Sequence, residues 1–82
     1  MRPHHHSPVK LTIMDEQRNR LLDVLELSIE EAGQLIGRTS LHWCLSNLGQ
    51  TSPVAYDCFH KVIVSYKLEE IQSFVLKEVS HA

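Results

Sequence analysis

Residues 27–37 read LSIEEAGQLIG, and this stretch decides the fold that the sequence predicts. Ser28 followed three positions later by Glu31 forms a capping box, in which two side chains satisfy backbone N–H groups at the start of a helix. Gly37 is suited to end that helix, because glycine adopts a positive φ without steric cost. Gly33 costs the helix interior about 1 kcal/mol relative to alanine, which indicates that another group packs closely against it.

The helical pattern extends toward the amino end of the chain. Thr12 and Asp15 form a TxxD start signal, and apolar residues then recur every three or four positions. These apolar residues are Leu21, Leu25, Ile29, Ala32 and Ile36. The spacing predicts one long helix over residues 14–36. The Ser28 capping box predicts instead that a separate helix begins at Ile29.

Three more helices are predicted downstream, over residues 40–48, 53–66 and 68–79. The second of them starts at Ser52–Pro53, a cap followed by proline at the first helical position, where its missing N–H costs nothing. Within that segment KVIVSYK is rich in β-branched residues and alternates as a half-buried strand does. A strand over residues 62–68 is therefore the alternative.

These elements predict an all-α, helix-turn-helix-like domain of four helices, packed orthogonally or as a small bundle. The alternative is an α domain with a short β-hairpin wing around residues 56–68. Residues 1–11 begin MRPHHHSPVK and are interpreted as a disordered arm or a tag remnant, which leaves residues 12–82 as a single helical domain.

Length and composition narrow the classes of function. A chain of 82 residues is one domain that buries only about 60% of its unfolded surface, so a second copy can complete its core. Its net charge of -2 provides no basic field for phosphate backbones. Two cysteines without a signal-peptide pattern indicate a reducing cytoplasm, and no apolar run approaches the roughly 18 residues of a membrane span.

Residues 27–37 resemble the first helix of the helix-turn-helix in excisionase and MerR-like DNA-binding proteins. YKLEEIQSF at residues 66–74 resembles the helix that follows the wing in those families, and Pro53 and Tyr56 are similar to residues that lead into the wing. The resemblance spans Leu27 to Leu76 and implies a DNA-binding transcriptional regulator. It places seven residues on DNA: Arg38, Thr39, Ser40, His42, Asn47, Lys61 and Lys67.

Charge in the same span favours another use of the domain. Residues 27–76 contain three basic residues against five acidic ones. A recognition helix needs Arg, Lys, Asn or Gln toward the base edges, and LHWCLSNL offers only His42, Ser46 and Asn47. A degenerate helix-turn-helix reused for protein contact fits this composition better than a DNA reader.

One set of metal-ligand residue types occurs in the chain: His42, Cys44, Cys58 and His60. The set is a mirrored HxC and CxH pair, which suggests zinc. On a helix, however, residues two apart point about 200° from each other, so neither pair could reach one ion. We therefore interpret the cysteines as core residues and expect neither a metal nor another cofactor.

The favoured function is a small non-enzymatic regulator that acts by protein contact. The acidic pairs at Glu30–Glu31 and Glu69–Glu70 lie in the first turns of predicted helices. Acidic side chains stabilise a helix at this position through the helix dipole, so we assign them no catalytic role. The first helix is apolar around more than half of its circumference and needs cover on two sides. The sequence thus predicts a homodimer or an adaptor for a transcription-related partner. The interface residues predicted are Leu21, Leu22, Leu25, Ile29, Trp43 and Tyr56.

Overall fold

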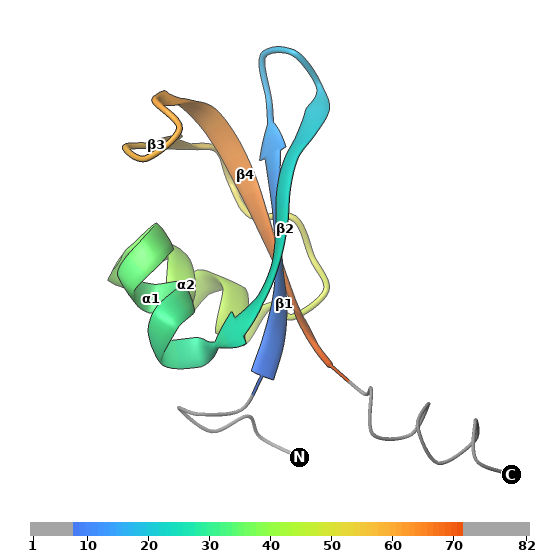
Figure 1. Ribbon diagram of the computed structural model, residues 1–82, viewed down its shortest axis with the longest axis vertical. Coiled ribbons are helices and arrows are strands. Elements are labelled where there is room, and N and C mark those ends of the chain that lie inside the picture. Colours follow the sequence, from blue (N-terminus) through green and yellow to red (C-terminus); the bar gives the residue numbers. More distant parts are fainter. Residues whose placement is uncertain (1–7, 72–82) are drawn as a thin grey trace, which may run out of the picture.

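The computed structural model describes residues 8–71, and a four-stranded antiparallel sheet dominates that part of the chain (Figure 1). In chain order the elements are β1 (Pro8–Asp15), β2 (Arg20–Ser28), α1 (Ile29–Ile36), α2 (Arg38–Ser46), β3 (Ala55–Asp57) and β4 (Val62–Glu70). The strand order in the sheet is β2-β1-β4-β3. The predicted all-α domain of four helices is therefore wrong.

β1 lies inside the sheet and pairs antiparallel with β2 on one side and β4 on the other. Its side chains alternate, as those of a strand with one face on a core do. Val9, Leu11 and Ile13 have no exposed surface, whereas the residues between them are exposed or half-buried. Residues 8–11, which the sequence assigns to a disordered arm, thus belong to the sheet, and residues 1–7 lie outside the described part.

Asp15 turns the chain from β1 into β2. Its Oδ1 accepts hydrogen bonds from the backbone N–H groups of Gln17 and Arg18, both at 3.0 Å. The bond from the Arg18 backbone contributes most to holding the pKa of Asp15 below its ordinary value, although burial acts in the opposite direction. An aspartate accepts N–H groups two and three residues ahead at a hairpin turn as it does at a helix N-cap. For this reason the TxxD signal precedes a turn, and the helix predicted over residues 14–36 is wrong.

A β-bulge in β2 removes the alternation of apolar and polar residues by which a strand is predicted from sequence. The register shifts between Ile13 and Met14, which pair with Asp23 and Leu21, so Leu22 is an extra residue on the bulged strand. A bulge interrupts the alternation of sides along a strand. The apolar residues of β2 therefore take a spacing that is typical of a helix: Leu21, Leu22, Val24, Leu25 and Leu27.

The capping box at Ser28 is confirmed, and so is the alternative in which a separate helix begins at Ile29. Ser28 Oγ accepts the Glu31 backbone N–H at 3.1 Å, and Glu31 Oε1 accepts the Ser28 backbone N–H at 2.9 Å. Gly37 ends α1 with φ 90°, and its N–H donates to the Gly33 carbonyl at 2.8 Å. The sequence thus located both ends of α1.

Close packing at Gly33 is confirmed as well. A Cβ at this position would lie 2.8 Å from Cδ2 of Leu41 on α2, so the Leu41 side chain packs directly against the backbone of α1. α2 occupies residues 38–46, two residues earlier than the predicted helix over 40–48. It begins directly after Gly37, whose carbonyl accepts the Leu41 N–H at 3.0 Å.

The helix predicted over residues 53–66 is wrong, because β3, a turn and β4 occupy this part of the chain. The alternative strand over 62–68 is confirmed. Ser52, predicted as a helix cap, instead extends the sheet: its Oγ accepts the Tyr66 N–H at 2.9 Å, and its own N–H donates to the Tyr66 carbonyl at 2.8 Å. The hydroxyl thus accepts a backbone N–H as a cap does, but that N–H belongs to a strand.

Two further predictions concern the carboxyl half. The β-hairpin that the alternative fold placed around residues 56–68 is present, but it forms half of a larger sheet rather than a wing. Of the helix predicted over residues 68–79, residues 68–70 belong to β4. Residues 72–79 lie outside the described residues.

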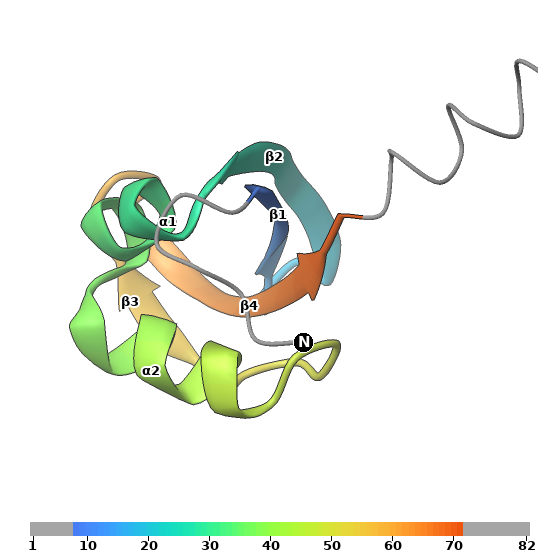
Figure 2. The ribbon, with the colours of Figure 1, turned by 90° about the horizontal axis from the view of Figure 1, so that it is seen from below.

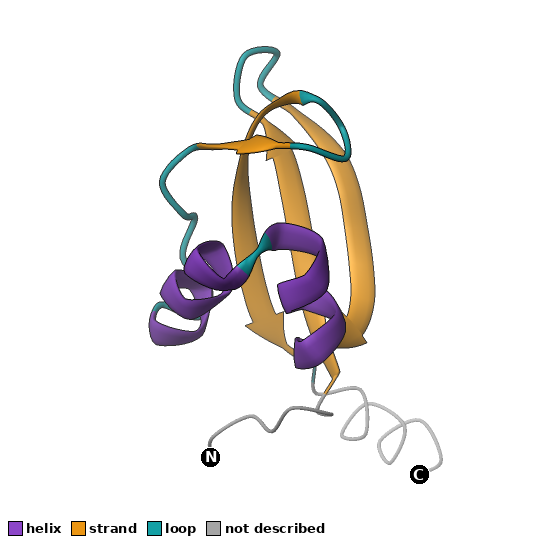
Figure 3. Ribbon diagram, turned by 90° about the vertical axis from the view of Figure 1, so that its left-hand side faces the viewer, coloured by secondary structure: helices purple, strands orange, loops and turns teal. Residues whose placement is uncertain are grey.

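The core lies between the sheet and the two helices, which share one side of it (Figures 1 and 3). Seen from below, the sheet curls around this core (Figure 2). The buried apolar residues of the described chain come from β1, β4 and both helices. They are Val9, Leu11, Ile13, Ile29, Ala32, Cys44, Val64, Tyr66 and Leu68.

We expect Ser28→Ala to lower the free energy of unfolding by about 1 kcal/mol, because it leaves the Glu31 N–H at the start of α1 without its acceptor. Urea denaturation followed by circular dichroism measures this loss. Ser46→Ala, at an exposed position at the end of α2, is the matched control and should change stability by less than about 0.5 kcal/mol. Equal effects of the two substitutions would contradict a structural role for the cap.

Candidate functional site

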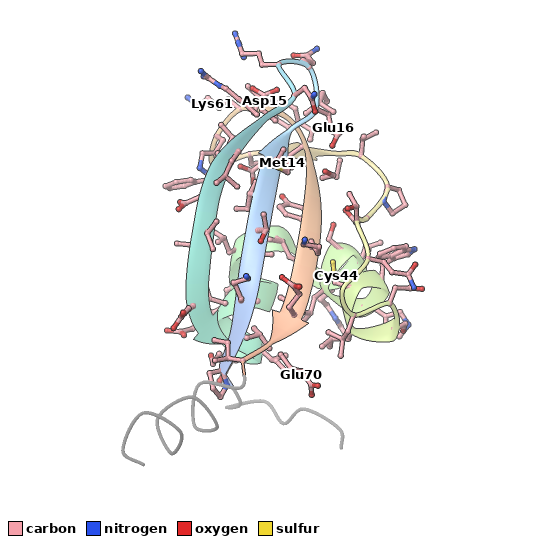
Figure 4. The ribbon with its side chains drawn as sticks, turned by 90° about the vertical axis from the view of Figure 1, so that its right-hand side faces the viewer. Met14, Asp15, Glu16, Cys44, Lys61 and Glu70 are labelled. Atoms are coloured by element: carbon pink, nitrogen blue, oxygen red, sulfur yellow. The ribbon has the colours of Figure 1, made fainter. Side chains whose placement is uncertain are left out.

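The sheet has one covered and one open face. Both helices lie on the same side of the sheet in Figure 1, and no described element lies against the other side. Figure 4 shows the sheet from its open side, with Met14 in the upper half of the sheet and Glu70 at its lower end. Because side chains alternate along a strand, the residues between the buried positions of β1 and β4 point to the open face.

An apolar group of side chains occupies the upper half of this face, and we name it the open-face patch. It consists of Met14, Leu21, Val24, Tyr56 and Ile63. Cross-strand pairing places Leu21 opposite Met14 and Ile63 opposite Tyr56. Leu21 is 54% exposed, Val24 45% and Tyr56 57%. Large apolar side chains with this exposure, grouped on one face, are typical of a protein-binding surface.

The lower half of the open face is charged. Lys10 is paired with Glu26 on β2 and with Glu69 on β4, and its Nζ lies 3.6 Å from Glu69 Oε1. An acid, a base and an acid therefore form a row across three strands, and such opposite-charge pairs stabilise a sheet. These residues border the open-face patch at its lower end.

The free edge of β2 is capped by its own side chains. The Val24 N–H donates to Asp23 Oδ1 at 2.9 Å, and the Ser28 N–H donates to Glu31 Oε1 at 2.9 Å. In an antiparallel strand every second residue directs its N–H and C=O away from its partner, so these are groups that an added strand would need. The edge is thus partly closed to strand addition, in the manner of protected edge strands.

A second polar feature is the turn between β3 and β4, where Asp57 accepts three hydrogen bonds. Its Oδ2 accepts the His60 backbone N–H at 2.8 Å and is bonded to His60 Nδ1, and its Oδ1 accepts the Tyr66 hydroxyl at 3.0 Å. The Asp57 carbonyl also accepts the Lys61 N–H at 2.6 Å. Asp57 is 3% exposed, so a buried carboxylate holds the turn to β4. We name Asp57, His60 and Tyr66 the turn network.

The turn network shifts the acidity of two of its members. Burial acts to raise the pKa of Asp57, but the bonds from His60 and Tyr66 outweigh it, so the pKa lies below its ordinary value. Burial raises the pKa of Tyr66 far above its ordinary value, and the neighbouring Asp57 carboxylate adds to the shift. At neutral pH the carboxylate is therefore charged and the phenol neutral, which is the pairing that the hydrogen bond requires.

The turn presents Phe59, which is 73% exposed. Its ring meets the His60 ring edge-on, with centroids 5.0 Å apart and planes at 81°. Lys61 closes the turn in a left-handed conformation, φ 62°, which a residue with a Cβ adopts only at a cost. The side chain of Phe59 thus projects from a turn whose backbone is fixed by the network beneath it.

The predicted interface residues divide between surface and core. Leu21 and Tyr56 belong to the open-face patch. Leu22, Leu25 and Trp43 are partly buried and pack against the core, and Ile29 is only 5% exposed. Two of the six predicted residues therefore lie exposed on the open face. Leu21 reaches this face from β2 and not from the predicted helix.

The four residues considered for zinc come from two elements. His42 is exposed and Cys44 buried on α2, whereas Cys58 and His60 lie in the turn after β3. The prediction that both cysteines are core residues is therefore confirmed for Cys44 and wrong for Cys58, which is exposed. Burial raises the pKa of the Cys44 thiol, which opposes the thiolate form that binds metal. Within residues 8–71 no group of three or more His, Cys, Asp and Glu side chains is placed to hold a metal ion.

The residues predicted to contact DNA do not share one surface. Arg38, Thr39, Ser40 and His42 lie on α2, on the covered side of the sheet. Asn47 caps α2 and donates from Nδ2 to the Trp43 carbonyl at 2.8 Å. Lys61 lies in the turn before β4. Lys67 pairs with Thr12 and so points to the open face.

The turn network and three members of the open-face patch were not predicted from the sequence. Asp57 and His60, three apart and followed by a β-branched strand, form an Asx-type turn signal that a strand reading of residues 62–68 would have brought out. Val24, Met14 and Ile63 become recognisable only when β2, β1 and β4 are aligned in register. No local pattern carries that information.

A scan of protein-family models and searches of curated proteins and of solved structures found no match to this chain. No helix between residues 8 and 71 is long and apolar enough to cross a membrane.

We expect Asp57→Asn to lower the free energy of unfolding at pH 7 by about 1–3 kcal/mol, because it weakens three hydrogen bonds to a buried carboxylate. The folded pKa of Asp57 is lowered, so its contribution is complete above the unfolded pKa of about 3.9 and is lost as pH falls through the folded value. The gap between wild type and Asp57→Asn should thus narrow below about pH 4.

Urea denaturation at a series of pH values measures this gap. Glu70→Gln, at an exposed position at the end of β4, is the control, and its difference from wild type should stay within about 0.5 kcal/mol. A gap for Asp57→Asn that is constant down to about pH 2 would show that the carboxylate charge does not stabilise the turn.

Proposed function

We propose that this protein is a small non-enzymatic regulator that acts by binding another protein chain through its open-face patch. The observation that carries the proposal is the exposure of Leu21 and Val24 on β2 and of Tyr56 on β3, which the strand register places on the sheet face that no described element covers. Small domains usually bury such side chains or use them for binding.

The physical cost of the patch supports a binding role. A large aliphatic side chain left fully in water forgoes about 1.5–3 kcal/mol that burial would contribute. Leu21 and Val24 are 54% and 45% exposed, so each forgoes roughly half of that. Domain stability is only about 5–15 kcal/mol in total, so three exposed large apolar residues on one face are a substantial loss for a small chain. A partner that covers them recovers this free energy on binding.

The surroundings of the patch fit a specific contact. The charged row at Lys10 borders the patch below, and polar rims of this kind surround apolar interface centres. The capped edge of β2 opposes uncontrolled strand addition. The transcription-related partner that the resemblance implies stays a prediction.

We expect Leu21→Lys together with Val24→Lys to abolish co-purification of the partner from cells that express the protein naturally. Two charges in the middle of an apolar contact would have to be desolvated without a counter-charge, which costs several kcal/mol. Quantitative mass spectrometry of tagged wild type and variant measures the loss.

Phe59→Ser is the matched control, because it removes an even more exposed apolar side chain from the turn rather than from the open face. It should leave the partner in place. Recovery of the same proteins with wild type and with the double lysine variant, both folded by circular dichroism, would refute binding through this face.

A further inference from the structure

We infer that the free edge of β3 is a binding site for an extended segment of another protein, which adds to the four-stranded sheet beside Ala55–Asp57. The inference goes beyond the proposed function, because it concerns an edge of the sheet rather than its open face. It follows from the direction of the backbone groups in β3, from the contrast with the edge of β2 and from the exposed apolar side chains next to these groups.

The hydrogen bonds of β4 show which of its residues face β3. The backbone N–H and C=O of Tyr66 bond to Ser52, on the side of β4 where β3 lies. The Ile63 carbonyl accepts the Glu16 N–H at 3.0 Å, on the side of β1. Because these directions alternate along an antiparallel strand, the even-numbered residues of β4 turn their backbone groups toward β3.

The backbone of Tyr56 therefore faces the free edge. β3 pairs Ala55 with Val64 and Asp57 with Val62, so these two pairs carry the hydrogen bonds between β3 and β4. Tyr56 lies between them and directs its N–H and C=O away from β4. An extended backbone offers the acceptor and the donor that these two groups require, which is how proteins bind peptides by strand addition.

This edge lacks the protection that is found at β2. There, carboxylates accept the N–H groups of Val24 and Ser28. Within residues 8–71, no side chain accepts an N–H group of residues 54–56. Because β3 is only three residues long, it accepts a short segment, and this shortness opposes the addition of long aggregating strands.

The side chains at the edge indicate which kind of segment fits. Val54 is 61% exposed and Tyr56 57%, and Tyr56 lies on the open face opposite Ile63. An added strand places every second side chain beside Tyr56, where aromatic and β-branched cross-strand pairs are stabilising. The segment is therefore one with apolar residues at alternate positions.

The position of β3 favours a segment from another chain. β1 begins and β4 ends at the lower end of the sheet, whereas β3 lies at its upper end (Figure 1). β3 pairs with residues 62–64, and Glu70 lies six residues further along β4, which is about 20 Å of extended strand. We therefore assign the edge to another protein rather than to the ends of this chain.

Short random peptides displayed on phage and selected on the full immobilised chain test the inference. Enriched sequences should carry apolar residues at alternate positions, and the synthetic peptides should bind the full chain in solution, as measured by fluorescence polarisation. A selection that enriches no peptide of this pattern would overturn the inference.

Two substitutions of Tyr56 separate the backbone from the side chain. Tyr56→Pro and Tyr56→Ser both remove the phenol ring, but only proline removes the outward N–H, and an edge strand accepts proline where that group faces solvent. A selected peptide should bind Tyr56→Pro at least about 10-fold more weakly than Tyr56→Ser, because its carbonyl loses a donor. Equal affinities, with both variants folded by circular dichroism, would overturn the inference.

Amide hydrogen exchange of wild type with bound peptide does not depend on variants that fold. Exchange should slow at Tyr56, whose N–H gains an acceptor, and change less at Ala55, which is already bonded to Val64. Slower exchange at Leu21 and Val24 without Tyr56 would overturn the inference and assign the peptide to the open face instead.

Discussion

The pairing of β1 with β4 is the interaction on which the rest of the structure depends. Each of these strands also belongs to a hairpin, β1 with β2 and β4 with β3, and an isolated two-stranded hairpin is only marginally stable in water. Their pairing joins the hairpins into one sheet and places Leu11 opposite Leu68 and Ile13 opposite Tyr66. The side chains of these two pairs are buried, and both helices pack against the sheet face that they form.

Both candidate functional features derive from the same pairing. With β1 and β4 side by side, their outward residues Met14 and Ile63 fall on one face together with Leu21 and Tyr56 from the outer strands. The inward residue Tyr66 is carried to the buried side, where its hydroxyl reaches Asp57. The open-face patch and the Tyr66 side chain of the turn network therefore lie on opposite faces of the same sheet.

The sequence allowed α1 and the contact at Gly33 to be predicted, because the signals that define them are local. A capping box and a terminal glycine act within one turn of helix. The sheet could not be predicted in the same way. Asp15 and Ser52 accept backbone N–H groups as caps do, and the nature of the element that supplies those groups depends on residues far away in the chain. The extra residue Leu22 removed the alternation that would have identified β2.

The long separation between the two central strands has a consequence for how the protein is made. The Glu16–Ser65 hydrogen bond beside them already joins residues 49 positions apart, and non-local strand pairing slows folding because the loop must close before its contacts form. The hairpin of β1 and β2 precedes both helices and β4 in the chain, so Leu11 and Ile13 lack their cross-strand partners Leu68 and Tyr66 until β4 is synthesised. Until then the nascent chain can cover the core-facing side of β1 only with its two short helices.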